Sequence, residues 1–136
     1  MRGVVIVFAV LCLLVSQGAS AAQEKVRIEL NTAETADNRC RMNFVVENKA
    51  DTALDSMKLD IVAFGIDGGI MRRLIAEMGP LRPQKTIVKT YLVEAECKAI
   101  GALLVNDVTQ CAPAPAAACL DGLALSSRLK EIRLYK

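Results

Sequence analysis

Short stretches of alternating apolar and polar residues run along most of this chain. Between residues 25 and 31, for example, Val26, Ile28 and Leu30 alternate with charged or amide side chains. A period of two residues is typical of β-strands that bury one face and expose the other. Turn-forming pairs such as Asp67-Gly68 and Gly79-Pro80 separate the stretches. The pattern predicts strands at residues 25–31, 40–48, 57–64, 70–78, 86–93, 101–108 and 121–127.

Seven or eight short strands without a long amphipathic helix indicate an all-β fold. We expect an antiparallel β-sandwich with an immunoglobulin-like topology, and a small β-barrel is the alternative. The pattern does not decide the secondary structure of two segments. Residues 70–78 have a mixed period that also suits a short helix, and residues 128–136 suit either an eighth strand or a helical turn. A length of 136 residues fits a single domain.

The first 21 residues have the layout of a secretory signal peptide. Arg2 precedes twelve apolar residues, Val4 to Val15, and Ala19-Ser20-Ala21 forms a small-residue cleavage signature. Twelve helical residues extend about 18 Å, which is too short for a hydrocarbon core of about 30 Å and disfavours a transmembrane anchor. We therefore expect cleavage after Ala21, one domain over residues 22–136, and a soluble periplasmic or secreted protein.

Four cysteines, Cys40, Cys97, Cys111 and Cys119, follow that segment. An even number in an exported chain indicates disulfides, and the spacing gives neither a C-x-x-C motif nor the two close pairs of a zinc site. In an up-and-down chain path the second and sixth strands run the same way. That path places Cys40 and Cys97 at one end of the sandwich and Cys111 and Cys119 at the other. Of the three possible pairings we expect Cys40–Cys97 and Cys111–Cys119, since the strand between Cys97 and Cys111 spans about 26 Å.

Composition removes several classes of function. The sequence contains no histidine, so it cannot form serine–histidine or cysteine–histidine nucleophile pairs or a histidine zinc site. Aromatic residues make up 4% and the formal net charge is +2, which argues against a nucleic-acid binder. We predict no catalytic residue, no metal site and no cofactor.

Three carboxylates are the nominees for a carboxylate-based enzyme or enzyme subunit: Asp107 with either Glu94 or Glu96. Exposure at a strand end is the simpler interpretation of Glu94 and Glu96, and a turn or a side chain bonded to the backbone is the simpler interpretation of Asp107. Asp67-Gly68 lacks the ligand ladder of a calcium loop and indicates a turn.

Two other patterns have a simple structural interpretation. Ser127 and Lys130 match the S-x-x-K spacing, but the partner motifs S-D-N and K-T-G are missing. Arg72-Arg73 and the segment Arg82–Lys85 form small basic patches. Such patches could contact an anionic envelope polymer, but an ordinary charged strand edge is the simpler interpretation.

Three blocks of the sequence are similar to small, uncharacterised exported bacterial proteins. The blocks are Cys40–Asn48, Phe64 to Gly68, and Leu104–Val108 with the following Cys111. The resemblance covers roughly residues 38–128. It implies a periplasmic β-sandwich and assigns no activity and no functional residue.

The function expected from the sequence is that of a non-catalytic β-sandwich module that binds or supports another cell-envelope component. Its partner would be an unknown envelope protein or polymer, not nucleic acid, and the mature chain has no transmembrane segment. Recognition would use an exposed sheet edge or the loops at one end. A carboxylate-based enzyme and a thiol redox protein are the alternatives.

Overall fold

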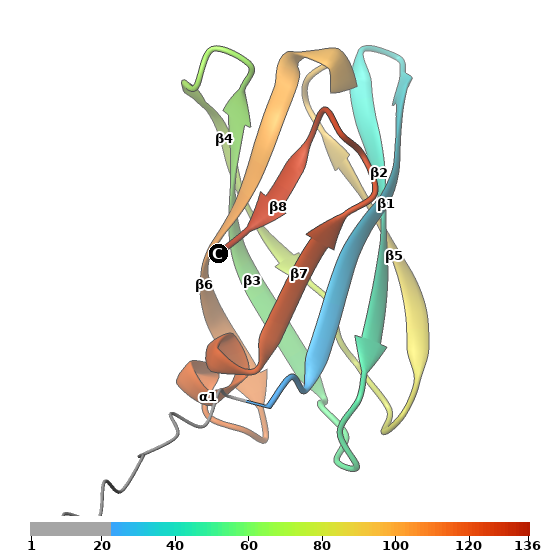
Figure 1. Ribbon diagram of the computed structural model, residues 1–136, viewed down its shortest axis with the longest axis vertical. Coiled ribbons are helices and arrows are strands. Elements are labelled where there is room, and N and C mark those ends of the chain that lie inside the picture. Colours follow the sequence, from blue (N-terminus) through green and yellow to red (C-terminus); the bar gives the residue numbers. More distant parts are fainter. Residues whose placement is uncertain (1–22) are drawn as a thin grey trace, which may run out of the picture.

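The computed structural model describes residues 23–136, so the expected signal peptide and its cleavage site lie outside the described residues. Within this part, two four-stranded sheets pack face to face (Figure 1). Their strand orders are β5-β2-β1-β7 and β4-β3-β6-β8. The elements are β1 Val26–Ala36, β2 Arg39–Asn48, β3 Ser56–Gly65, β4 Ile70–Glu77, β5 Thr86–Val93, the 3-10 helix η1 Cys97–Ala99, β6 Ile100–Ala112, α1 Ala116–Asp121, β7 Leu123–Ser127 and β8 Arg133–Tyr135.

The chain reverses direction with every successive strand (Figure 1). Strands an odd number of places apart are therefore antiparallel, as in β1–β2, β2–β5, β3–β4 and β3–β6. The pairs β1–β7 and β6–β8 are an even number of places apart, so they are parallel. The expectation of purely antiparallel sheets was wrong for this reason, and an immunoglobulin-like topology is not confirmed. Two separate sheets also replace the alternative of a closed barrel.

The seven expected strands all form, and two of them run several residues further than expected. β1 continues past a register shift between Leu30 and Thr32, and β6 continues to Ala112 through several shifts against β3. Residues 70–78 form a strand, not a helix, and residues 133–135 supply a short eighth strand. The stretch from Cys111 to Cys119 contains the start of α1.

The core lies between the sheets and follows the sequence alternation. On β2, for example, Cys40, Met42, Phe44 and Val46 all point inward and are buried. Their burial removes apolar surface from water, which is the main favourable contribution to folding. Other large side chains that are almost completely buried are Ile28, Leu30, Met57, Leu59, Met78, Leu81, Ile100 and Leu103.

Two disulfides fasten opposite ends of the sandwich. Cys40 at the start of β2 is bonded to Cys97 in η1, with their Cα atoms 4.7 Å apart. Cys111 near the end of β6 is bonded to Cys119 in α1, with a Cα separation of 6.4 Å. These are the two pairs expected from an up-and-down chain path.

Candidate functional site

The nominated carboxylates do not converge. Asp107 lies on β6, directly opposite Asp60 of β3, and its Oδ1 accepts a hydrogen bond from the amide of Val108 at 2.8 Å. Glu94 and Glu96 follow β5 instead, and Glu96 pairs with Lys98 at 2.8 Å. Asp107 is seven residues along β6 from the strand's first residue, about 23 Å from that end of the sheet. No acid/base pair is formed by these residues.

Two other sequence motifs have local structural roles. The Asp67 carboxylate accepts the amide of Gly69 at 3.0 Å, and Gly68 adopts a positive φ of 84°, so this segment is a turn. The Ser127 hydroxyl exchanges hydrogen bonds with the backbone of Leu129 at 3.1 and 3.2 Å. Neither motif presents a reactive group.

A buried carboxylate that the sequence did not reveal lies on the outer face of β3. Asp60 is only 3% exposed, and both of its oxygens accept hydrogen bonds from Arg73, at 2.8 and 2.6 Å. The Asn106 amide donates to the same carboxylate at 2.8 Å. The hydrogen bonds from Arg73, supported by that from Asn106, hold the pKa of Asp60 below its usual value. Both oxygens of Asp60 are thus hydrogen-bonded within the sheet, which gives this carboxylate a structural role.

Glu77, at the end of β4, is a second internally bonded carboxylate. Burial raises its pKa, but hydrogen bonds from the Ser56 hydroxyl and the amides of Met57 and Gly79 outweigh that effect and leave the pKa lowered. Glu77 thereby fastens the end of β4 to the start of β3. It is not free to act as a general base.

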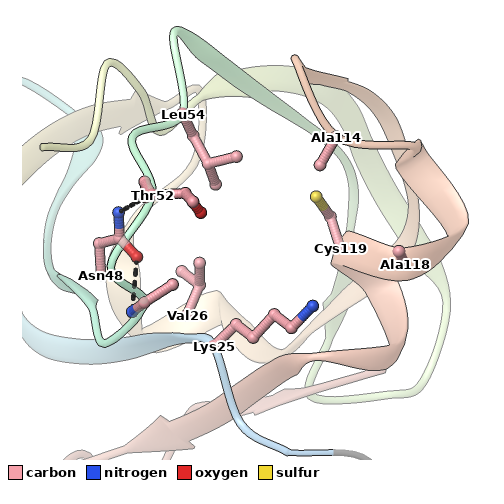
Figure 2. Close-up of a pocket in the computed structure, with 9 residues that line it drawn as sticks. Lys25, Val26, Asn48, Thr52, Leu54, Ala114, Ala118 and Cys119 are labelled. Atoms are coloured by element: carbon pink, nitrogen blue, oxygen red, sulfur yellow. Dashed lines mark hydrogen bonds between the residues drawn. The ribbon is translucent and has the colours of Figure 1, made fainter. Parts of the chain in front are cut away.

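A small cavity lies beside α1 and the Cys111–Cys119 disulfide (Figure 2). The Asn48 amide at its wall donates to the Thr52 carbonyl at 2.9 Å and accepts from the amide of Ala50 at 3.0 Å. The volume of about 70 Å³ falls well short of the roughly 300 Å³ at which ordinary small-molecule sites begin. Residues at the wall are Lys25, Val26, Asn48, Ala50, Thr52, Leu54, Ala114, Ala118 and Cys119.

A larger hollow of about 340 Å³ lies between the β3–β4 hairpin and β8. Its wall includes Phe64, the 78%-exposed Ile66, and Arg133, whose guanidinium lies 5.0 Å from the centre of the Tyr135 ring. Among the described residues that line the hollow, none has a buried polar side chain. Ligand-binding pockets normally contain a few precisely placed polar groups that orient the ligand, so this hollow is a weak candidate for a binding site.

The strongest candidate surface is the side of the sandwich formed by β4, β5 and the connecting residues 78–85, here named the β4–β5 side. Both strands are the outermost strands of their sheets (Figure 1). Two side chains of β5 reach across to the β4 end: the Tyr91 hydroxyl donates to the Glu77 carbonyl, and the Lys89 ammonium donates to the Gly79 carbonyl at 2.8 Å. These bonds hold the two edges together at one end of the side.

Exposed apolar side chains are concentrated on this side. Val88 and Leu92 of β5, which are 63% and 46% exposed, lie on the outer face of one sheet. Ile75 of β4, which is 56% exposed, lies on the outer face of the other sheet. Between the two strands, Leu74, Tyr91 and Val93 contribute to a narrow recess whose exposed lining is entirely apolar. The exposed apolar residues next to the β5 edge are therefore Val88 and Leu92, which share the outer face of that strand.

The same side carries an excess of positive charge. Residues 70–93 contain five basic side chains, of which Arg73 is paired with Asp60 of β3. They contain one acidic side chain, Glu77, whose carboxylate is bonded internally. Four of these basic residues form the small patches visible in the sequence, and the structure brings them together with the exposed apolar residues. Their positions could be read from the sequence, but the free edges could not, because strand order in a sheet is a tertiary property. The five are Arg72, Arg73, Arg82, Lys85 and Lys89.

Comparisons with known proteins support the fold and no more. No protein-family model and no curated protein matches the sequence. A solved structure of IrmA from Escherichia coli shares the architecture, with a TM-score of 0.54, 10% identity, and coverage of 78% of this chain and 92% of IrmA. At this identity the likeness concerns the fold alone, and the resemblance to exported bacterial proteins gains no named family from it.

Proposed function

We propose that this protein is an exported, non-catalytic binding module that contacts another component of the cell envelope through its β4–β5 side. One observation carries the proposal: exposed apolar residues share this side with four basic residues that have no acidic partner among the described residues, next to two free sheet edges. The four are Arg72, Arg82, Lys85 and Lys89. Apolar area supplies binding free energy, whereas the surrounding charge steers and selects the partner.

The two disulfides support the exported location, because such bonds persist in oxidising compartments. No helix among residues 23–136 is long and apolar enough to span a bilayer. A carboxylate enzyme finds no support in the geometry, since its three nominees lie apart. A thiol redox role is likewise unsupported, because the four cysteines of the described chain are joined in pairs and three of them are buried.

Photo-crosslinking in the intact envelope tests the proposal. A photoreactive residue replaces Val88 on β5, and in a matched control it replaces Ser126 on β7. Both positions lie in one cross-strand row, Val88–Val45–Glu29–Ser126, at opposite edges of the same sheet. The proposal requires a discrete crosslinked product from position 88 that is missing from position 126. Recovery of the protein alone from position 88, in repeated experiments, would count against it.

A further inference from the structure

The backbone of β5 presents an unused row of hydrogen-bonding groups. The amide of Asn48 donates to the Lys85 carbonyl at 2.9 Å, and β5 pairs with β2 from there to Val93 without a register shift. Hydrogen-bonded pairs alternate along an antiparallel ladder, so Ile87, Lys89, Tyr91 and Val93 bond to β2. The amides and carbonyls of the intervening residues, Thr86, Val88, Thr90 and Leu92, point away from the sheet.

β5 is the free edge best suited to accept another strand. On β4, the Glu77 carbonyl already accepts the Tyr91 hydroxyl, and adjacent Arg72 and Arg73 are the kind of charged residues that discourage pairing. The opposite edges, β7 and β8, are only five and three residues long. β5 offers eight residues without an internal proline, and its Lys89 is held down on the Gly79 carbonyl.

Side chains and charge define the kind of segment that fits. A strand laid beside β5 would place alternate side chains next to Val88 and Leu92, and the others over the apolar recess at Leu74 and Tyr91. Exposed cations flank this apolar middle, with Arg72 toward one end and Lys85 toward the other. An apolar centre with carboxylates toward its ends complements that arrangement.

We propose that the β5 edge binds an extended, acidic–apolar segment of another polypeptide by strand addition. This inference rests on the proposed function and specifies its partner chemistry. The backbone groups of Thr86, Val88, Thr90 and Leu92 form the new ladder, and the alternate side chains of the guest provide selectivity. Anionic polymers without a peptide backbone would not form this ladder.

The test uses a synthetic peptide as long as β5, eight residues, with valine alternating with threonine and a glutamate at each end. Amide exchange of the full mature protein, measured by NMR, is expected to slow at Thr86, Val88, Thr90 and Leu92 when the peptide is added. Thr90→Pro removes one outward amide while leaving the bonds to β2, because proline is tolerated at edge positions whose amide faces solvent. Thr90→Val keeps that amide and, like the proline variant, lacks the hydroxyl that donates to Asn43.

We expect Thr90→Pro to weaken peptide affinity about tenfold or more, since it removes one bond and adds a steric obstacle, while Thr90→Val binds like the parent. A peptide N-methylated at alternate amides blocks the same ladder from the guest side, and it decides the question if Thr90→Pro does not fold. Exchanging the glutamates for lysines is expected to weaken binding by a similar factor. Equal affinity of the lysine peptide would overturn the acidic part of the inference.

Strand addition and the proposed function fail in different ways. If the proline variant and the N-methylated peptide bind normally while position 88 still crosslinks a partner in the envelope, strand addition is wrong and the binding side stands. Strand addition is also wrong, and the binding side again stands, if the crosslinked partner is a polysaccharide. If position 88 crosslinks nothing and the peptide does not bind, both proposals are wrong.

Discussion

Asp60 shows how a charged residue is accommodated in this molecule. Its side chain points to the outer face of a sheet, where water is normally available, yet neighbouring side chains cover it almost completely. Arg73 and Asn106 replace the lost water with three hydrogen bonds. No buried side-chain nitrogen or oxygen in the described part of the chain lacks a partner. The two buried polar side chains, Asn48 and Asp60, are thus held by hydrogen bonds within the fold.

Asp60→Asn is expected to lower the free energy of unfolding at neutral pH by about 1–2 kcal/mol, because a carboxylate that accepts charge-assisted bonds becomes a neutral amide. Arg73 is largely exposed, which keeps the effect modest. The matched control is Asp107→Asn, because Asp107 is an exposed carboxylate directly opposite Asp60 on β6. We expect this control to change the free energy of unfolding by no more than about 0.5 kcal/mol. Urea unfolding of the three proteins checks this, and equal losses in both variants would contradict it.

The lowered pKa of Asp60 gives the same experiment a pH dependence. A carboxyl whose pKa is lower in the folded state stabilises the fold above its unfolded pKa of about 4, and this contribution is lost as the pH falls through the folded value. The difference in stability between the parent protein and Asp60→Asn should therefore shrink as the pH is lowered below about 4. A difference that is constant from neutral to strongly acid pH would exclude the proposed role of the charge.

At the scale of elements, the two disulfides should contribute unequally to stability. Cys40–Cys97 closes a loop of 57 residues and Cys111–Cys119 one of 8. The chain-entropy estimate gives about 4 kcal/mol for the first and about 2.5 kcal/mol for the second. Replacing each pair with alanines and measuring urea unfolding checks the order. A larger loss from the 111–119 pair would show that this bridge acts through packing at α1 and not through chain entropy.

Alternation and β-branched composition are what made individual elements predictable. Residues 40–48 alternate except at Val45, residues 86–93 are rich in β-branched residues, and β2 and β5 match those ranges within one residue. Alternation could not locate the ends of β1 and β6, because register shifts move side chains to the other face. Nor could it reveal the burial of Asp60, which occupies an ordinary outward position and is covered only by tertiary neighbours. The basic residues of the β4–β5 side were visible, whereas the free edge beside them depends on which strands pair.

The whole molecule has an uneven distribution of charge. Outside residues 70–93 the full chain carries twelve basic and fourteen acidic residues, so the formal net charge of +2 conceals a positive side and a weakly negative remainder. This asymmetry would orient the protein toward an acidic partner before contact. It also makes the approach sensitive to salt, because exposed charges are screened beyond about 8–10 Å at ordinary ionic strength.

One measurement tests both the export of the chain and the formation of its disulfides. It is the intact mass of the protein recovered from the envelope, after alkylation with and without prior reduction. Cleavage after Ala21 predicts a mass that begins at Ala22. The disulfides predict four alkylated thiols after reduction and none before it. Cys12 would leave with the signal peptide, so a fifth alkylated thiol would mean that the leader is retained. Thiols that react before reduction would contradict the structural role of the bridges and revive the redox alternative, because a structural disulfide is unreactive toward alkylating agents until it is reduced.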